Sequence, residues 1–173
     1  MKLLLIVLVM AGIAFASVAV WAQWPRASLP AAARADRVVV RKSARVLELY
    51  SGAQLLRQYH VSLGGNPIGH KQREGDSRTP EGQYVLDYRK ADSAFHRALH
   101  ISYPAPADLA SAAKNGVAPG GFIMVHGIRN GLGWIGRLHS LRDWTDGCVA
   151  VTDRDIEEIW RAVPDHTPIR IEP

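Results

Sequence analysis

Cysteine is nearly absent from this chain of 173 residues, which contains only Cys148. A single thiol excludes an internal disulfide framework and a thioredoxin-like cysteine pair. It also excludes zinc and iron–sulfur sites that are built mainly from cysteine ligands. Any chemistry that uses this thiol must therefore obtain its partners from other residue types.

The chain also lacks a dense tract of basic residues and any internal repeat. Its net charge of +5 arises from 21 basic and 16 acidic residues, and the basic ones are scattered from Arg34 to Arg170. This scatter predicts no nucleic-acid partner, because nucleic-acid-binding domains gather basic residues on one face or segment. The 15 glycines and 10 prolines are also spread out, which excludes coiled coils and collagen and favours short elements joined by tight turns.

One long hydrophobic run is present at the start of the chain. Leu3 to Ala22 contains 20 residues without a charge and follows Lys2. Such a run is typical of a signal peptide and is also long enough to anchor a protein in a membrane. We expect residues 1–22 to be a signal peptide or membrane anchor, residues 23–36 a linker, and residues 37–173 one domain exported to the periplasm or cell envelope. An uncleaved segment would make the membrane a partner.

The exported part reads as short strands around a long polar loop. The expected strands are Val38–Val40, Arg45–Tyr50, Leu55–Leu63, Gln83–Tyr88, Ala98–Tyr103 and Gly121–His126. The first three predict an antiparallel meander. Gly64 to Gly82 is polar and rich in glycine, which predicts a loop, and long loops in compact domains are often functional. A short helix is expected over Pro106 to Lys114.

A second helix, which begins after Thr152, has the clearest local signals. Thr152 and Asp155 have the spacing of a capping box. Its apolar residues fall on one face, which predicts packing against the core: Ile156, Ile159, Trp160 and Val163. The acidic residues near its start, Glu158 among them, are interpreted as charges that complement the helix dipole and not as a catalytic acid and base.

Cys148 is the strongest candidate for chemistry. A free thiol in an exported protein is exposed to oxidation, and the preceding Gly147 lets a reacting group approach backbone N–H donors. A thiol nucleophile needs a base, because the thiolate attacks. His126, at the end of an apolar strand and before Gly127, is the preferred base, and His139 is the alternative. We expect a thiolate–imidazolium pair that makes the thiol unusually reactive.

Three other interpretations compete with a thiol nucleophile. Gly131 to Gly136 matches the glycine pattern of dinucleotide-binding loops, but no preceding strand and following helix accompany it. His126, His139 and Cys148 are allowed zinc ligands, although their spacing resembles no compact zinc module. Cys148 could also be a packing residue in a catalytically silent wall-binding domain. The thiol chemistry itself needs no metal or cofactor.

Several ordered motifs resemble one known family. Ile123 to Gly127 ends in His-Gly, and Cys148 follows His126 by 22 positions within Thr-Asp-Gly-Cys. Upstream, Gly75 to Gly82 contains a Thr-Pro-Glu-Gly turn, and Val61 to Gly64 resembles the strand end before it. Together these motifs resemble the L,D-transpeptidase (YkuD-type) catalytic domain, in a subgroup with a Thr-Asp-Gly-Cys motif. The resemblance covers residues 38–163.

The resemblance implies a mainly β fold, a β-sandwich or barrel with one or two short helices. It implies an enzyme that acts on peptidoglycan stem peptides by forming an acyl-enzyme at Cys148, releasing D-alanine and transferring the acyl group to an amine. His126 would be the base, the Gly127 carbonyl its orienter, and the N–H groups of Gly147 and Cys148 the oxyanion donors. The residues expected to contact substrate are His139, Thr145, Asp146, Arg129, Trp134 and Arg78.

Two positions depart from the family pattern. Many members carry His before the Gly-Cys pair and Arg two residues after the cysteine, where this chain has Asp146 and Ala150. An adjacent anion disfavours a thiolate, and the missing Arg removes a partner for a substrate carboxylate. The sequence therefore leaves open a peptidoglycan hydrolase with the same site, which would act as a carboxypeptidase or endopeptidase or release a wall-attached protein. Such a protein could equally be the acyl acceptor.

Overall fold

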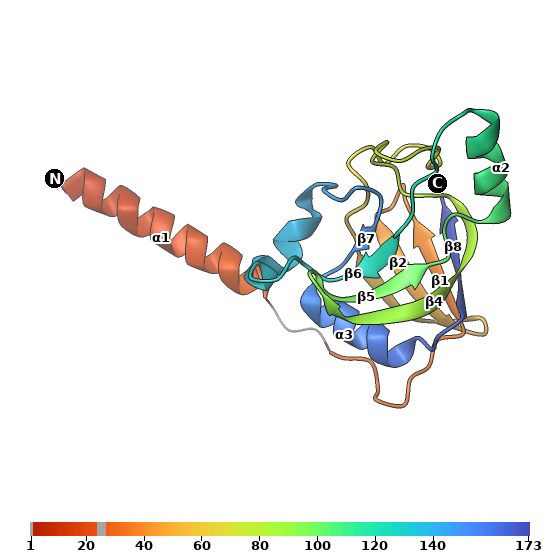
Figure 1. Ribbon diagram of the computed structural model, residues 1–173. Helices are drawn as coiled ribbons and strands as arrows, with labels where there is room; N and C mark the ends of the chain where they lie inside the picture. Colours follow the sequence, from red (N-terminus) through yellow and green to blue (C-terminus); the bar gives the residue numbers. More distant parts are fainter. Residues whose placement is uncertain (1, 24–26) are drawn as a thin grey trace.

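The computed structural model describes residues 2–23 and 27–173. Its main body is one curled sheet of eight strands with few helices (Figure 1), which confirms the expected mainly β fold. The strand order across the sheet is β3-β2-β1-β8-β4-β5-β6-β7. The strands are β1 (Arg37–Arg41), β2 (Val46–Ser51), β3 (Gln54–His60), β4 (Gly82–Ser93), β5 (His96–Ile101), β6 (Met124–His126), β7 (Val149–Ala150) and β8 (Thr167–Glu172).

The first three strands form the expected antiparallel meander. Val39 pairs with Glu48 across β1 and β2, and Leu47 pairs with Tyr59 across β2 and β3. β8, which sequence analysis missed, runs parallel to β1 and antiparallel to β4. It therefore joins the meander to the half of the sheet that carries the chemistry-bearing residues.

The other half of the sheet is built by β4, β5, β6 and β7. β4 and β5 form a hairpin that extends to Ser93 and His96, well beyond the expected strands. β6 is shorter than the expected strand Gly121–His126, because Phe122 has a positive φ of 56° that breaks the extended backbone. β6 then pairs in parallel with β7, so residues distant in sequence meet at the β6–β7 edge.

Two α-helices and one 3-10 segment accompany the sheet. α2 (Pro106–Lys114) has the expected bounds. α3 (Asp153–Ala162) is capped by Thr152, whose hydroxyl accepts a hydrogen bond from the Asp155 N–H at 3.1 Å. α3 packs against β5 and β6 beneath the curled sheet. η1 (Gly133–Leu141) is 3-10 in character and kinked at Gly136.

Glu158 of α3 is a buried anchor, which corrects its interpretation as a charge near the helix start. Its carboxylate accepts hydrogen bonds from the Tyr59 hydroxyl at 2.8 Å and from the Leu29 N–H at 3.1 Å. It also pairs with Arg57 at 3.3 Å. Burial and the nearby carboxylate of Glu158 raise the pKa of Tyr59 well above its ordinary value. Glu158 thus ties α3 to β3 and to the segment before β1.

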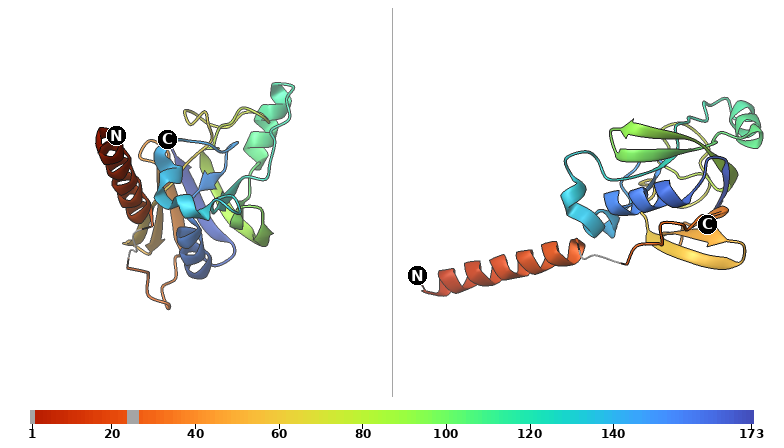
Figure 2. Two further views of the ribbon diagram at one scale, coloured as in Figure 1. Left: turned by 90° about the vertical axis from the view of Figure 1, so that its left-hand side faces the viewer. Right: turned by 90° about the horizontal axis from the view of Figure 1, so that it is seen from below.

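The N-terminal helix α1 (Lys2–Ala22) projects away from the sheet (Figure 2). It is long and apolar enough to cross a membrane, and its large apolar side chains that the structure describes, such as Leu4, Met10 and Trp21, are exposed. Its end approaches η1, where the Gln23 side chain donates to the Trp134 carbonyl at 2.6 Å. Residues 24–26 of the expected linker lie outside the described residues. The following stretch lies along α3, where the Ala35 N–H donates to the Ala162 carbonyl at 2.8 Å.

Candidate active site

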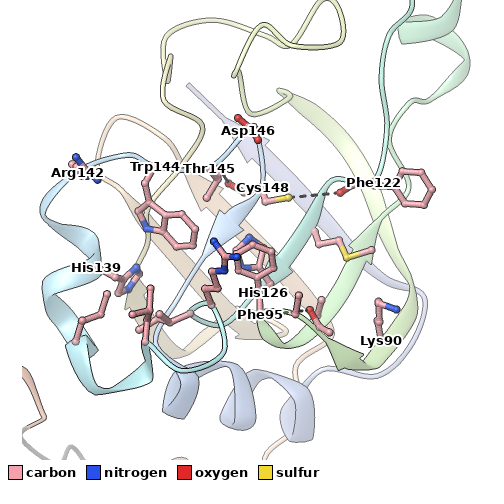
Figure 3. A pocket seen from close by; sticks show the side chains of 18 of the residues that line it. Lys90, Phe95, Phe122, His126, His139, Arg142, Trp144, Thr145, Asp146 and Cys148 are labelled. Carbon is pink, nitrogen blue, oxygen red and sulfur yellow. Dashed lines mark hydrogen bonds between the residues drawn. The ribbon is translucent and has the colours of Figure 1, made fainter.

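The pairing of β6 with β7 brings the candidate nucleophile and base to one cavity. His126 ends β6 and pairs with Ala150, while Cys148 immediately precedes β7. Both side chains line a cavity of about 940 Å³ (Figure 3). The pairing of two adjacent parallel strands therefore brings His126 and Cys148 to the same cavity although they are 22 positions apart in the sequence.

The Cys148 thiol is half-buried and directed at the segment that precedes β6. Its Sγ donates a hydrogen bond to the Phe122 carbonyl at 3.7 Å. Burial raises the pKa of the Cys148 thiol, and the nearby Asp146 carboxylate raises it further. The hydrogen bond from the Met124 N–H and the positive charge of Lys71 lower this pKa, but by less than burial raises it. The thiol is thus the resting form, in agreement with the bond that it donates.

The ring of His126 is buried, with 4% of its surface exposed. Its Nδ1 lies 2.6 Å from the Gly127 carbonyl. Because a carbonyl only accepts, Nδ1 carries the proton and Nε2 keeps its lone pair. Burial lowers the pKa of His126, and the bond to Gly127 opposes this only in part. The imidazole is therefore neutral at pH 7, and the resting pair is neutral where we expected a thiolate and an imidazolium.

Gly127 holds this carbonyl in place through close packing. Its N–H donates to the Phe95 carbonyl at 3.1 Å. A Cβ atom at this position would lie 2.8 Å from Asp153 Oδ1 and 3.1 Å from the Ile156 side chain. Asp153 also accepts from the Ile128 N–H at 2.7 Å. The start of α3 thus fixes the loop that orients the imidazole.

The turn before Cys148 is organised by Thr145. Its hydroxyl donates to the Cys148 carbonyl at 2.8 Å and accepts from the Gly147 N–H at 3.1 Å. Gly147 has a φ of +130°, and a Cβ there would lie 2.6 Å from the Arg78 carbonyl. Only glycine fits this backbone without strain. One of the two expected oxyanion donors, the Gly147 N–H, is already engaged in this state.

The long loop 64–82 packs against the turn that precedes Cys148. A Cβ atom on Gly64 would lie 2.2 Å from the Ser77 carbonyl, so the two ends of the loop pack without room for a side chain. The buried amine of Lys71 pairs with Asp76 at 2.9 Å. Lys42, also buried, pairs with Glu81 at 2.8 Å. Two ion pairs, each with a buried lysine, thus fix the loop that contacts the nucleophile turn.

His139, the alternative base, lines the same cavity from η1 but is held in a structural network. Its Nδ1 lies 3.3 Å from the Ser62 hydroxyl, and that hydroxyl donates to the His139 carbonyl at 2.9 Å. Burial and the neighbouring His126 lower the pKa of His139 to about 4. His139 is therefore neutral at pH 7 and a weaker base than an ordinary histidine.

The remaining expected contact residues are divided between the cavity and its surroundings. Thr145, Asp146 and Arg129 line the cavity. Trp134 and Arg78 do not: the Trp134 side chain is 66% exposed on η1, and Arg78 faces the turn through its backbone carbonyl. Among the described residues that line the cavity, three have cationic side chains suited to pairing with a substrate carboxylate: Arg129, Arg142 and Lys90. All three are exposed.

Sequence analysis missed an aromatic cluster around His126. The ring centroid of Phe95 lies 4.6 Å from that of His126, and the centroid of Trp144 lies 5.8 Å from it at an interplanar angle of 67°. Trp144 stands within the Asp-Trp-Thr-Asp-Gly-Cys segment and could have been identified by its proximity to Cys148. Phe95 belongs to the β4–β5 turn and carries no sequence signal that links it to the site.

The described residues contain no group of three or more His, Cys, Asp or Glu side chains placed to hold a metal ion. Most of the residues that line the cavity are apolar or aromatic. Its histidines and its cysteine lie at separate places along the cavity (Figure 3). The arrangement provides a thiol, a neutral imidazole whose Nε2 keeps its lone pair, and backbone donors. These are the groups that acyl transfer through a thioester requires.

Comparison with known proteins identifies relatives of similar sequence. The chain is 30% identical over 132 residues to YafK of Escherichia coli (strain K12), an L,D-transpeptidase-type protein by its name. The match covers 73% of this chain and 46% of YafK. The chain thus spans about half the length of the curated relatives it matches.

Solved structures show the same fold. The helical cell shape determining protein Pgp2 from Campylobacter jejuni superimposes with a TM-score of 0.60 at 25% identity, over 79% of this chain and 46% of Pgp2. The L,D-transpeptidase from Xylanimonas cellulosilytica gives a TM-score of 0.53 at 16% identity, over 85% of this chain and 62% of that structure. The family model for the YkuD L,D-transpeptidase catalytic domain matches residues 35–171, and the chain belongs to this family.

Proposed function

We propose that this chain is a cell-envelope L,D-transpeptidase that uses Cys148 as its nucleophile and peptidoglycan stem peptides as its substrates. The family acts on such peptides. The observation that carries the proposal is that His126, at the end of β6, and Cys148, immediately before the adjacent strand β7, line one cavity, and that Nε2 of the imidazole keeps the lone pair that accepts a proton. The reaction needs no metal or cofactor.

In the first half-reaction the Cys148 sulfur attacks the carbonyl carbon of the link between the L-centre of a diamino acid and a terminal D-residue. His126 Nε2 takes the thiol proton as the sulfur–carbon bond forms. The carbon–nitrogen bond then breaks, and His126 returns the proton to the leaving amine of D-alanine. A thioester remains on Cys148.

In the second half-reaction an amine attacks the thioester carbonyl and His126 accepts its proton. The carbon–sulfur bond breaks, and His126 returns that proton to the departing sulfur, which regenerates the thiol and the neutral imidazole. The amine belongs to a second stem peptide or to a wall-attached protein. Water in place of the amine gives hydrolysis, which would trim a stem peptide, cut a cross-link or release an attached protein.

The directions of the two pKa shifts support a base that acts during the attack. A raised thiol pKa and a lowered imidazole pKa both favour the neutral pair over the ion pair. Proton transfer then accompanies nucleophilic attack, as in general-base catalysis. The backbone N–H of Cys148, and that of Gly147 once it leaves Thr145, would stabilise the oxyanion.

The proposed organisation follows the sequence expectations. Residues 1–22 serve as a signal peptide or membrane anchor, residues 23–36 as a linker, and residues 37–173 as the catalytic domain. The exposed apolar α1 is compatible with either fate of the N-terminal segment. Among the cavity residues, Arg129 is suited to a substrate carboxylate, since it lines the cavity and is exposed to solvent.

Incubation with purified stem-peptide fragments, followed by mass analysis of the products, tests the proposal. Loss of D-alanine with gain of an amine supports the transferase, whereas gain of water in place of an amine identifies a carboxypeptidase, and a cut cross-link an endopeptidase. Cys148→Ala should abolish turnover while the protein stays folded. Unchanged turnover in this variant would overturn the proposal, and wall binding without chemistry in either protein would identify a non-catalytic domain.

A further inference from the structure

The segment η1 presents large apolar side chains to solvent next to the end of α1. The Trp134 and Leu141 side chains are 66% and 77% exposed, and that of Leu132, the residue before η1, is 43% exposed. We call these three residues the η1 apolar surface. Large apolar side chains that stay exposed together mark a surface that binds a protein or a membrane. The position and the charge of this surface distinguish between these two partners.

Packing between α1 and η1 fixes the position of the η1 apolar surface. The Gln23 side chain donates hydrogen bonds to the carbonyls of Trp134 at 2.6 Å and Gly133 at 3.3 Å. Ala22 is buried, and a Cβ atom on Gly136 would lie 2.4 Å from the Ala22 carbonyl oxygen. Figure 1 shows η1 on the side of the domain from which α1 projects. η1 therefore lies at the level of the last residues of α1.

That level is a membrane surface when α1 crosses a bilayer. The apolar span Leu4–Ala22 has 19 residues, which matches a hydrocarbon core of about 30 Å. Its last residue then lies at the boundary between the acyl chains and the headgroups. Trp21, at this end of α1, is exposed, and tryptophan is enriched at such boundaries. Trp134, whose backbone is bonded to Gln23, lies at the same boundary.

The charge around the η1 apolar surface complements an anionic membrane. Residues 128–142 contain three arginines and neither aspartate nor glutamate, and Arg129 and Arg142 are exposed. Asp143, which follows this segment, pairs with Arg45 at 2.9 Å. Asp153, beside Gly133, accepts a hydrogen bond from the Ile128 N–H at 2.7 Å. Exposed tryptophan and leucine combined with arginine are typical of segments that lie in the interface of anionic membranes.

We propose that the η1 apolar surface, with Arg129 and Arg142, docks in the headgroup region of a membrane that contains anionic lipids while α1 spans the bilayer. This inference rests on the anchor alternative of the proposed organisation and adds a membrane-binding surface of the catalytic domain to it. Ile135 and Leu138 of η1 line the cavity that contains Cys148. Docking of η1 therefore holds this cavity next to the membrane, where it acts on stem peptides close to the bilayer.

Nitroxide labels on the full-length protein in vesicles of phosphatidylglycerol and phosphatidylethanolamine test the inference. Cys148→Ala removes the native thiol, and Trp134→Cys or Leu141→Cys then places a single label on the η1 apolar surface. Leu109→Cys is the matched control, because Leu109 is an exposed leucine of α2, which lies far from α1 (Figure 1). We expect the labels at positions 134 and 141 to lose collisions with a water-soluble nickel complex and to gain collisions with oxygen. The label at position 109 should keep its collisions with nickel. Equal accessibility to nickel at the three positions would overturn the inference.

Three further measurements separate the lipid, the anchor and the chemistry. In vesicles of phosphatidylcholine alone, the labels on the η1 apolar surface should regain part of their collisions with nickel, because the arginines lose their anionic partners; equal protection in both vesicles would overturn the role of anionic lipids. The protein extracted from the membranes of the producing cells should have the mass of the full chain, and a chain without residues 1–22 would overturn the inference. Turnover of stem peptides by the unlabelled wild type tests the Cys148 chemistry independently of both results.

Discussion

Asp76 offers a quantitative test of how the loop 64–82 supports the nucleophile turn. Its carboxylate pairs with the buried Lys71 amine and accepts N–H bonds from Gln72, Arg73 and Arg78. Burial by itself would raise the pKa of Asp76, but the bond from Lys71 and the three backbone N–H donors together lower it to about 2. The ordinary value is about 3.9, so the ionised form is favoured by about 2.5 kcal/mol in the folded protein.

Asp76→Asn removes the charge and keeps the shape of the side chain. The folded-state pKa of Asp76 is depressed, so its contribution to the free energy of unfolding is complete above about pH 5 and is lost as the pH falls through about 2. We expect the variant to be less stable by about 2–3 kcal/mol at pH 7. The difference from the wild type should shrink between pH 4 and pH 2.

Urea unfolding followed by tryptophan fluorescence measures this difference, since the chain has five tryptophans. Asp92→Asn is the control: Asp92 pairs with Lys90 but its side chain is 87% exposed, so its unfolding curve should match the wild type. A stability loss in Asp76→Asn that stayed constant from pH 7 to pH 2 would refute the electrostatic account of the loop.

Three further predictions follow from the site and its supports. The pH profile of kcat/KM should have its acid limb below the ordinary imidazole pKa of about 6.5 and its alkaline limb above the ordinary thiol pKa of about 8.5, because burial lowers the pKa of His126 and raises that of Cys148. A rate that rises only as the pH passes through the thiol range would contradict a neutral resting pair. Gly147→Ala should lower the free energy of unfolding by at least about 1–3 kcal/mol in urea titrations, since its φ of +130° is strained for alanine; an unchanged midpoint would be evidence against that turn. Glu158→Ala should lower the free energy of unfolding by about 3 kcal/mol, because it leaves buried hydrogen-bond partners unpaired. Glu157→Ala removes a half-exposed carboxylate and should lower it by less than about 1 kcal/mol. Equal losses for the two variants in thermal unfolding would argue against the buried role of Glu158.

Local signals in the sequence were sufficient to predict the positions of α2 and α3. α2 has the expected bounds, and α3 begins at the residue that its capping threonine indicates. Glu158 was misinterpreted because its partners, Tyr59 and Leu29, are distant in sequence. β8 was missed for the same reason, since its pairing with β1 and β4 is a long-range property.

The candidate site could be predicted in part. The Cys148 and His126 motifs predicted which residues share a cavity, and the β6–β7 pairing places them there. The charge state of the pair could not be predicted, because burial of both groups depends on packing by distant elements. Trp134 was expected to contact substrate because of its place upstream of Cys148 in the family resemblance, yet its side chain on η1 is exposed and lies outside the cavity. Trp144 occupies the cavity instead.

The mass of the protein after a brief, acid-quenched incubation with a donor stem peptide tests the central claim most directly. A thioester at Cys148 predicts an increase equal to the mass of the peptide minus that of D-alanine, mapped to Cys148, the only cysteine in the chain. The adduct should be absent from Cys148→Ala. Turnover of the peptide at an equal rate in wild type and Cys148→Ala, with no adduct in either, would contradict the account.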